Sequence, residues 1–231
     1  MNALANYGPR QLPGTQPLEG HGVRVEPIVD ARHFDALFAA FSKDRKSEIF
    51  DHLPYGPFAD QAAFHRWAEA TYLADNIRFH AILPSAAGRA EGVAALMRTD
   101  TANGVTEIGH ICLSPSLQRS RAASEAFYLI MKRVFDELGY RRLEWKCDDR
   151  NQPSKRAAER LGFVHEGLFR QHMIVKGRNR DTAWYAIIDQ DWPRVRSGFE
   201  AWLAPDNFDA AGRQRRGLTE MRESLAKADL T

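Results

Sequence analysis

One stretch decides the fold, and it opens with the apolar segment Glu107-Ile108-Gly109-His110-Ile111-Cys112-Leu113. That segment has the composition of a β-strand and breaks at Ser114-Pro115. The polar loop Gln118-Arg119-Ser120-Arg121 follows and leads into a helix predicted over about 119–138, whose apolar residues recur at helical spacing. Gly139 ends that helix, because glycine readily adopts the left-handed conformation that follows many helix C-termini.

The same order of strand and helix then repeats. A second strand is predicted from Arg142 to Cys147, and Asn151-Gln152-Pro153-Ser154 begins another helix that stops at Gly162-Phe163. A helix N-terminus presents unpaired main-chain N–H groups and a partial positive charge. Because two such termini follow strand ends within a short stretch, the sequence predicts a phosphorylated ligand before any catalytic residue is chosen.

The remaining segments complete a sheet. Asp30 caps a helix predicted to end near Ser42, a second helix is predicted over about 60–74, and Asn103-Gly104 is a strong hairpin signal. Further strands are predicted at 23–28, 77–83, 91–99, 167–175 and 182–188, with a turn at 176–181 between the last two. Hairpins mixed with strand–helix–strand units predict an α+β fold with one sheet of about seven strands, part antiparallel and part parallel, flanked by helices.

Composition narrows the function classes. The chain has 231 residues, of which 44% are hydrophobic and 27% charged, as is typical of a globular protein. A net charge of +2 gives no support to nucleic acid as a partner. Cys112 and Cys147 lie in apolar strand patterns, so we expect buried free thiols in a reducing compartment and no metal site. Without an apolar run long enough to span a membrane, and without a signal peptide, we expect a cytoplasmic protein with no membrane partner.

Three regions are expected along the chain. Residues 1–20 are rich in Gly, Pro, Asn and Gln, which predicts an extended N-terminal arm. Residues 21–193 carry all the predicted strands and form one domain. Residues 194–231 form a charged C-terminal extension that is helical in pattern, mainly over 217–228.

The chain resembles the GCN5-related N-acetyltransferases (GNAT), and within them the RimJ/RimL-like branch. The matching segments are Glu107-Ile108-Gly109-His110, the loop and helix start at 118–126, Asn151-Gln152-Pro153-Ser154, Leu161-Gly162-Phe163 with Glu166-Gly167, and the final hairpin at 176–185. The resemblance covers about residues 20–193. Each motif alone is weakly specific, but their order and spacing together are characteristic.

The resemblance implies a GNAT-like fold with acetyl-CoA as cosubstrate and no metal. Acetyl-CoA would lie in a V-shaped gap where the strands at 105–113 and 142–148 splay apart. Its arm, which contains two amides, would pair with the free strand edge, and its pyrophosphate would rest on N–H groups at the following helix start. The residues implied to bind it are Ile111, Cys112, Leu113, Gln118, Arg119, Ser120, Arg121, Ala122, Ala123, Ser124, Asn151 and Ser154.

The phosphate loop departs from the family pattern at one position. The family places small residues there, usually glycine, so that the backbone approaches phosphate closely. Here Arg121 stands where the key glycine is expected. Either the loop has lost phosphate binding, or Arg119 and Arg121 add charge-assisted contacts to phosphate.

Acetyl transfer to an amine requires removal of an amine proton, stabilisation of an oxyanion and departure of a thiolate. Relatives often use a carboxylate on the first splayed strand as the base, and Glu107 stands on that strand. A strand-edge ion pair is the competing role for Glu107. His110 lies three residues on, and so is expected on the opposite strand face, as a second candidate base; His172 is a third.

The sequence indicates the residue that protonates the leaving thiolate less clearly than it indicates the base. Many relatives use a tyrosine at the position that Ala158 occupies here. Ser154 is the replacement candidate, and its alternative role is that of a first-turn hydroxyl. Asn151 caps the same helix and, by the resemblance, contacts the cofactor arm.

The sequence gives only weak indications of the residues that bind the acceptor amine. Tyr55, Phe58, Trp67 and Trp184 could line an acceptor pocket, although aromatic residues at such spacing more often belong to a core. The basic stretches 176–181 and 213–216 are either solvated surface or a recognition surface for an acidic or phosphorylated acceptor. We expect an N-acetyltransferase that acts on a protein N-terminus or on a small-molecule amine. A non-catalytic acyl-CoA-binding regulator is the alternative, and a homodimer stays open.

Overall fold

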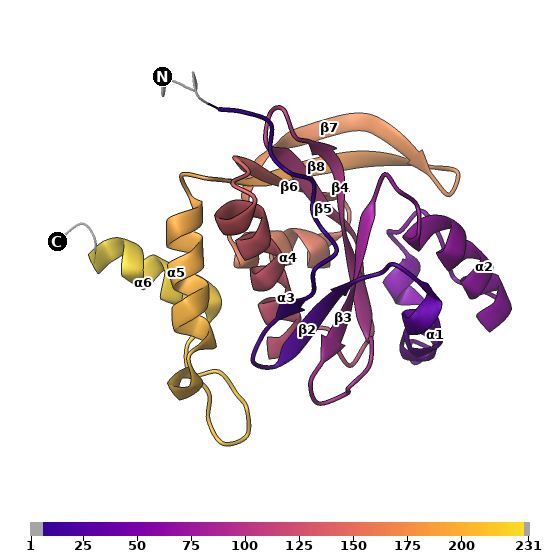
Figure 1. Cartoon of the computed structure of the whole chain (residues 1–231), viewed down its shortest axis with the longest axis horizontal. Coiled ribbons are helices and arrows are strands. Elements are labelled where there is room, and N and C mark those ends of the chain that lie inside the picture. Colours follow the sequence, from indigo (N-terminus) through magenta and orange to yellow (C-terminus); the bar gives the residue numbers. More distant parts are fainter. Residues whose placement is uncertain (1–6, 229–231) are drawn as a thin grey trace.

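The computed structural model describes residues 7–228 as one eight-stranded sheet with helices on both faces (Figure 1). The strands lie in the order β1-β2-β3-β4-β5-β6-β8-β7. Their bounds are β1 (Leu18–Glu19), β2 (Val23–Pro27), β3 (Arg78–Pro84), β4 (Gly92–Asp100), β5 (Val105–Leu113), β6 (Arg142–Asp148), β7 (Val164–Val175) and β8 (Arg178–Ile188). The predicted α+β class with a mixed sheet is confirmed. The additional strand is β1, which belongs to the predicted arm and pairs with β2.

The central pair of strands is splayed. Every neighbouring pair is antiparallel except β5 and β6, which run parallel. Their pairing ends at Glu107 opposite Glu144, after only three residue pairs. Beyond that point β5 continues to Leu113 and β6 to Asp148, but these two strands no longer pair with each other. The two strands therefore open a gap in the middle of the sheet.

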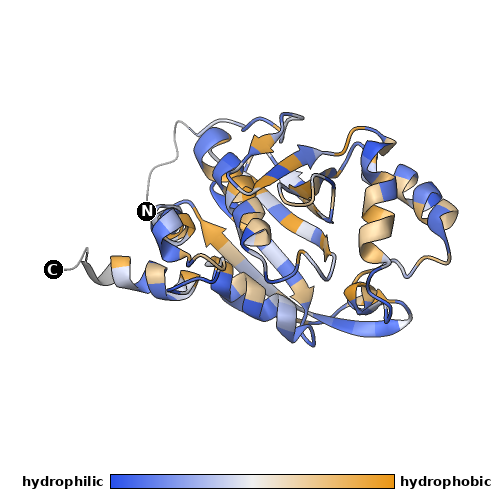
Figure 2. Cartoon of the chain, turned by 90° about the horizontal axis from the view of Figure 1, so that it is seen from below, coloured by the Kyte–Doolittle hydropathy of each residue, from blue (hydrophilic) through white to orange (hydrophobic). Residues whose placement is uncertain are grey.

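Helices cover both faces of the sheet. One face carries α3 (Arg121–Lys132), α4 (Gln152–Leu161), α5 (Trp192–Leu203) and α6 (Leu218–Ala228), and the other carries α1 (Phe34–Phe41) and α2 (Gln61–Tyr72) (Figure 1). Each face of the sheet buries its own apolar cluster. Hydrophobic colour falls on stretches of the strands and in bands along the helices (Figure 2). Three short 3-10 helices complete the described chain: η1 (Ala31–His33), η2 (Glu48–Phe50) and η4 (Pro205–Asn207).

Local sequence signals set the helix ends near the gap. Ser120 and Asn151 cap α3 and α4, since each side chain accepts a main-chain N–H from three residues further on. Gly162 ends α4 with a φ of 108°, where a Cβ would lie 2.9 Å from Val195. The predicted helix over 119–138 is α3 followed by a π-helical segment, Arg133–Glu137.

The last hairpin is longer than predicted. Only Lys176 and Gly177 form its turn, and residues 178–181, expected in the turn, begin β8 instead. The hairpin arches toward the side of the molecule that carries α1 and α2 (Figure 1). Lys176 Nζ, at its tip, donates a hydrogen bond of 2.9 Å to the Phe50 carbonyl. This long-range contact and the strand ladder override the turn-like composition.

Both terminal regions pack on the domain. In the predicted arm, the Arg10 N–H bonds the Thr101 carbonyl. In the predicted C-terminal extension, Arg222 donates to the main-chain carbonyls of Glu159 and Arg160. The parts of these regions at 1–6 and 229–231 lie outside the described residues. Among residues 7–228, no helix is both long enough and apolar enough to cross a membrane.

Candidate active site

The two leading candidate bases lie on the same face of β5, which corrects the expectation from simple strand alternation. β5 has one more residue than β4 between its pairs at Gly109 and Cys112. His110 lies in this β-bulge with a left-handed φ of 49°. The extra residue shifts the alternation, so the His110 ring points to the aromatic cluster under α1 and α2, on the face where Glu107 lies.

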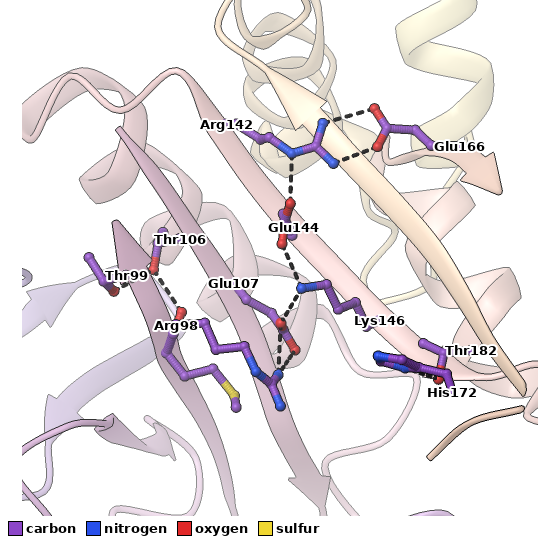
Figure 3. A network of polar contacts seen from close by, with 11 residues as sticks. Arg98, Thr99, Thr106, Glu107, Arg142, Glu144, Lys146, Glu166, His172 and Thr182 are labelled. Atoms are coloured by element: carbon purple, nitrogen blue, oxygen red, sulfur yellow. Dashed lines mark hydrogen bonds and ion pairs between the residues drawn. The ribbon is translucent and has the colours of Figure 1, made fainter. Parts of the chain in front are cut away.

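Glu107 is the centre of a set of ion pairs that crosses the gap (Figure 3). Its carboxylate lies 2.9 Å from the Arg98 guanidinium and 2.9 Å from the Lys146 ammonium. The side chains of Glu107 and Lys146 are only 5% and 9% exposed, so this pair is shielded from water. The ammonium also lies 3.7 Å from the centre of the Trp184 ring. Both carboxylate oxygens of Glu107 therefore already accept hydrogen bonds from cations.

The set of ion pairs continues away from the gap along β6 (Figure 3). Lys146 also contacts Glu144 at 2.7 Å, and Glu144 contacts Arg142 at 2.8 Å. Arg142 then forms a two-pronged pair with Glu166 on β7. Charges of alternating sign thus connect β4, β5, β6 and β7 at the place where the backbone ladder between β5 and β6 stops.

His110 has surroundings that favour a neutral ring. Burial lowers the pKa of His110 below its usual value of 6.5, and the charge of Arg98 lowers it further, while Glu107 opposes the shift. Its ring stacks on Tyr55 with the ring centres 5.6 Å apart. Its Nδ1 is buried and has no hydrogen-bond partner among residues 7–228. A neutral imidazole accepts a proton, so His110 meets the first chemical requirement for a base.

The edge of β5 that faces β6 can accept an extended ligand. Cys112 and Leu113 pair with β4 through their other edge, and within residues 7–228 no β6 residue beyond Glu144 pairs with β5. Gln118 Nε2 donates a hydrogen bond of 3.1 Å to the Leu113 carbonyl at the end of the strand. A ligand arm that contains amides can bind such an edge as an added strand does. The segment Ile111–Leu113, predicted to bind a cofactor arm, lies at this edge.

The loop after β5 presents N–H groups at the start of α3. Ser120 Oγ accepts the Ala123 N–H at 3.0 Å, and Arg119 has a left-handed φ of 55° that turns the chain. Among residues 7–228, the main-chain N–H groups of Arg119, Arg121 and Ala122 have no hydrogen-bond acceptor. Such adjacent N–H groups suit a pyrophosphate, because each donates to an anionic oxygen in the positive field of the helix end.

The Arg121 side chain is engaged with the C-terminal extension. Its guanidinium donates to the Leu203 carbonyl at the end of α5 and lies 4.0 Å from the centre of the Phe208 ring. Arg160 of α4 donates to Ser124 Oγ at 3.0 Å, within the first turns of α3. The extension therefore packs against the start of α3. A phosphate contact by Arg121 would require this side chain to leave the extension.

Ser154 and Asn151 lie together at the start of α4. Asn151 Oδ1 accepts the Ser154 N–H at 3.1 Å, and Ser154 Oγ accepts the indole N–H of Trp145 at 3.0 Å. The neighbouring Cys147 thiol has its pKa raised, mainly by burial. Ala158 is fully buried, so this position supplies no hydroxyl. Ser154 keeps a proton that it can donate, because its oxygen acts as the acceptor toward Trp145.

A cavity of about 470 Å³ lies at the end of β6 that is remote from its pairing with β5. It lies between the chain after η2, the end of β6 and the β7–β8 hairpin, and is lined by Asp51, His52, Asp148, Arg150, Val175, Lys176, Arg178 and Arg180. Tyr55, Phe58 and Trp67 pack against the aromatic cluster under α1 and α2, in agreement with the core interpretation. The third candidate base, His172, has its Nδ1 3.0 Å from Thr182 Oγ1 on the hairpin (Figure 3).

Two cations of this site were not predicted from the sequence: Arg98 and Lys146. A signal existed for Lys146, since it alternates with Glu144 on the polar face of a strand that neighbours Glu107. No comparable signal marked Arg98, which enters the site through a second bulge where its φ is 48°. Arg180 belongs to the basic stretch 176–181, for which the sequence left a solvated surface and an acceptor-recognition surface open, and the longer β8 places it beside the cavity.

Comparison with known proteins gives matches over most of the chain. Residues 23–164 match the acetyltransferase (GNAT) domain family. YnaD, an uncharacterised N-acetyltransferase of Bacillus subtilis (strain 168), is 34% identical to this chain over 87 residues. The match covers 37% of this chain and 50% of YnaD, so the chain spans about half the length of this relative. The crystal structure of a GCN5-related N-acetyltransferase from Brucella melitensis is 49% identical, with a TM-score of 0.92 over 95% of this chain and 100% of that chain.

A more distant structure shares the fold. The acetyltransferase from Salmonella typhimurium that modifies the N-terminal serine of ribosomal protein L7/L12 is 21% identical, with a TM-score of 0.64 over 75% of this chain and 99% of that chain. The family match and the Brucella structure each cover more than half of this chain. The chain therefore belongs to the GCN5-related N-acetyltransferase family, as its sequence resemblance predicted.

Proposed function

We propose that this chain is an acetyl-CoA-dependent N-acetyltransferase that transfers an acetyl group directly to a primary amine. The observation that carries the proposal is the asymmetry of the gap. Within residues 7–228, one side offers a free strand edge and unpaired N–H groups, and the other offers the half-buried imidazole of His110 and a cavity lined by charged side chains. The first side suits a nucleotide-linked acyl donor, and the second suits an amine that must lose a proton.

Acetyl-CoA, when bound, supplies an activated acyl group in the form of a thioester. The edge of Ile111–Leu113 would hold its amide-containing arm, and the N–H groups of Arg119, Arg121 and Ala122 would hold its pyrophosphate. Asn151, at the start of α4, would contact the arm from the β6 side. The fit rests on groups that lack partners within residues 7–228, rather than on a glycine-rich loop.

We assign the proton acceptor to His110. Its ring is neutral at physiological pH because its pKa lies below 6.5, and its Nδ1 has no partner among residues 7–228. The Glu107 carboxylate stabilises the imidazolium that forms, since its charge favours the protonated ring. Glu107 remains the competing base, although its carboxylate is already engaged in two ion pairs, with Arg98 and Lys146. Ser154 is the proposed donor of a proton to the leaving thiolate.

The acceptor is either a protein N-terminus or a small-molecule amine. The test is to measure free thiol released from acetyl-CoA with a panel that contains peptides of varied N-termini and small primary amines. We expect acetyl-CoA to raise the melting temperature and at least one amine to release thiol well above the rate with water. No melting shift at millimolar acetyl-CoA would overturn the cofactor assignment.

A non-catalytic acyl-CoA-binding regulator is the second candidate, and the buried Ala158 favours it, because many relatives carry a tyrosine at that position. The same experiment separates the two functions. A melting shift with acetyl-CoA, but no thiol release on any amine, supports the regulator. Release of thiol that depends on an amine removes it.

A further inference from the structure

The cavity at the end of β6 carries an excess of positive charge. Four cationic side chains line it, against the carboxylates of Asp51 and Asp148. Arg150 is paired with Asp148 at 2.8 Å, so these two largely neutralise each other. This leaves an excess positive charge in a cavity of about 470 Å³, on a chain whose net charge is only +2.

The remaining cations differ in how they are held. Lys176 Nζ bonds the Phe50 carbonyl, which fixes the hairpin tip over the cavity. Arg178 is exposed near the tip, whereas Arg180 is half-buried and its Nε is completely buried. Among residues 7–228, neither arginine side chain forms a hydrogen bond or an ion pair, and the buried Nε of Arg180 lacks any partner. A half-buried guanidinium that lacks an anion is costly unless a ligand supplies one.

Arg180 also lies close to the proposed chemistry. Its charge acts on His110, where it contributes to the lowered pKa of that ring. Asp148 and Glu107 are near enough to act on the pKa of Arg180 itself, which burial lowers. Arg180 thus lines the cavity, and its charge reaches the proposed base. An acceptor whose anionic group is held by Arg180 is therefore the kind of amine that this site would select.

We propose that Arg180, assisted by Arg178, binds an anionic oxygen group, a carboxylate or a phosphate, that is carried by the acceptor amine. The inference rests on the proposed function, because it names the chemical class of its acceptor. Guanidinium binds both anions through two parallel N–H donors, so the shared chemistry is an oxyanion near a primary amine. The size of the cavity is in the range of small-molecule sites.

The test compares matched pairs of amines that differ only in the anion. The first pair is O-phosphoethanolamine and ethanolamine, and the second is β-alanine and its amide. The third pair consists of two peptides that begin with serine and differ only at the second position, which is Asp in one and Asn in the other. The measured quantity is the preference ratio, kcat/KM with the anionic member divided by kcat/KM with the neutral member. The three pairs distinguish a phosphate, a small carboxylate and a peptide carboxylate as the source of the anion.

We expect Arg180→Gln to lower the preference ratio about 10- to 100-fold for at least one pair, mainly through KM, because one charge-assisted contact is lost. Arg178→Gln should lower the same ratio less, since that side chain is exposed. Arg194→Gln, exposed on α5 across the sheet, is the matched control and should leave the ratio unchanged. Melting temperatures with and without acetyl-CoA show whether each variant is folded, and Arg178→Gln carries the test if Arg180→Gln does not fold.

Two results would overturn the inference. If amines are acetylated but the ratio is unchanged in both cavity variants, the acceptor anion does not bind there, while the proposed function stands. If no amine is acetylated by the unmodified chain, the proposed function fails and this inference fails with it.

Discussion

The Lys146 ammonium lies 2.9 Å from the Glu107 carboxylate, just past the last backbone pair that joins β5 to β6. At the point where main-chain hydrogen bonds stop linking the two strands, a buried ion pair links them instead. The gap can therefore remain open for a ligand while its two walls stay connected. This arrangement makes the pair a structural element first, and it limits the catalytic roles open to Glu107.

Removing one partner of this pair should be costly. Lys146→Met leaves the nearly buried Glu107 carboxylate with Arg98 alone, and we expect the free energy of unfolding to fall by about 3 kcal/mol. Glu107→Gln should cost less, because Lys146 keeps Glu144 at 2.7 Å. Urea unfolding of both variants and of the double variant gives the coupling energy. Additive losses would show that the two side chains do not act as a pair.

The pH dependence of acetyl transfer should identify the base. A base is active when unprotonated, so kcat/KM should fall as the pH is lowered through the pKa of His110, which lies below 6.5. His110→Gln should reduce the rate about 100-fold or more and remove this limb of the profile. Glu107→Gln should keep the limb but move it to lower pH, because Glu107 raises the pKa of His110. If Glu107→Gln alone removes the limb, the carboxylate is the base.

Much of the fold follows from local signals in the sequence. Asp30 and Asn151 cap helices as predicted, and Gly162 ends one. These signals act within one or two turns of chain and therefore need no tertiary information. The same holds for the apolar strands, whose bounds differ from the predictions by a few residues.

The site was less predictable because it depends on long-range geometry. The bulge at His110 changes which face the ring occupies, and strand periodicity alone assigns the wrong face. Arg121 was interpreted within its own loop, yet its partners are Leu203 and Phe208, more than eighty residues away. The cation of Arg180 belongs to the site only because the last hairpin is long. Each of these facts requires contacts that no local pattern encodes.

Arg121 should stabilise the C-terminal extension. Arg121→Ala removes a hydrogen bond to Leu203 and a contact with the Phe208 ring, so we expect a loss of about 1–2 kcal/mol and faster proteolysis after α5. Affinity for CoA should change little, because the main-chain N–H groups of the loop remain. Arg119→Ala, which changes an exposed side chain of the same loop, is the comparison variant. A large loss of CoA affinity in Arg121→Ala at unchanged stability would instead assign Arg121 to the phosphates.

His80 should make the fold sensitive to mild acid. Burial, together with the charges of Arg78 and Arg133, lowers the pKa of His80 to about 4 in the folded protein, against 6.5 for an unfolded chain. Between these values the unfolded chain binds a proton that the folded chain does not, so stability is full above pH 6.5 and falls as the pH approaches 4. The shift corresponds to roughly 3 kcal/mol. His80→Leu should flatten the plot of unfolding free energy against pH, and it also removes an Nδ1 that has no hydrogen-bond partner among residues 7–228. The variant His21→Gln, at an exposed site, should leave the plot unchanged. An unchanged slope in His80→Leu would show that other groups cause the acid sensitivity.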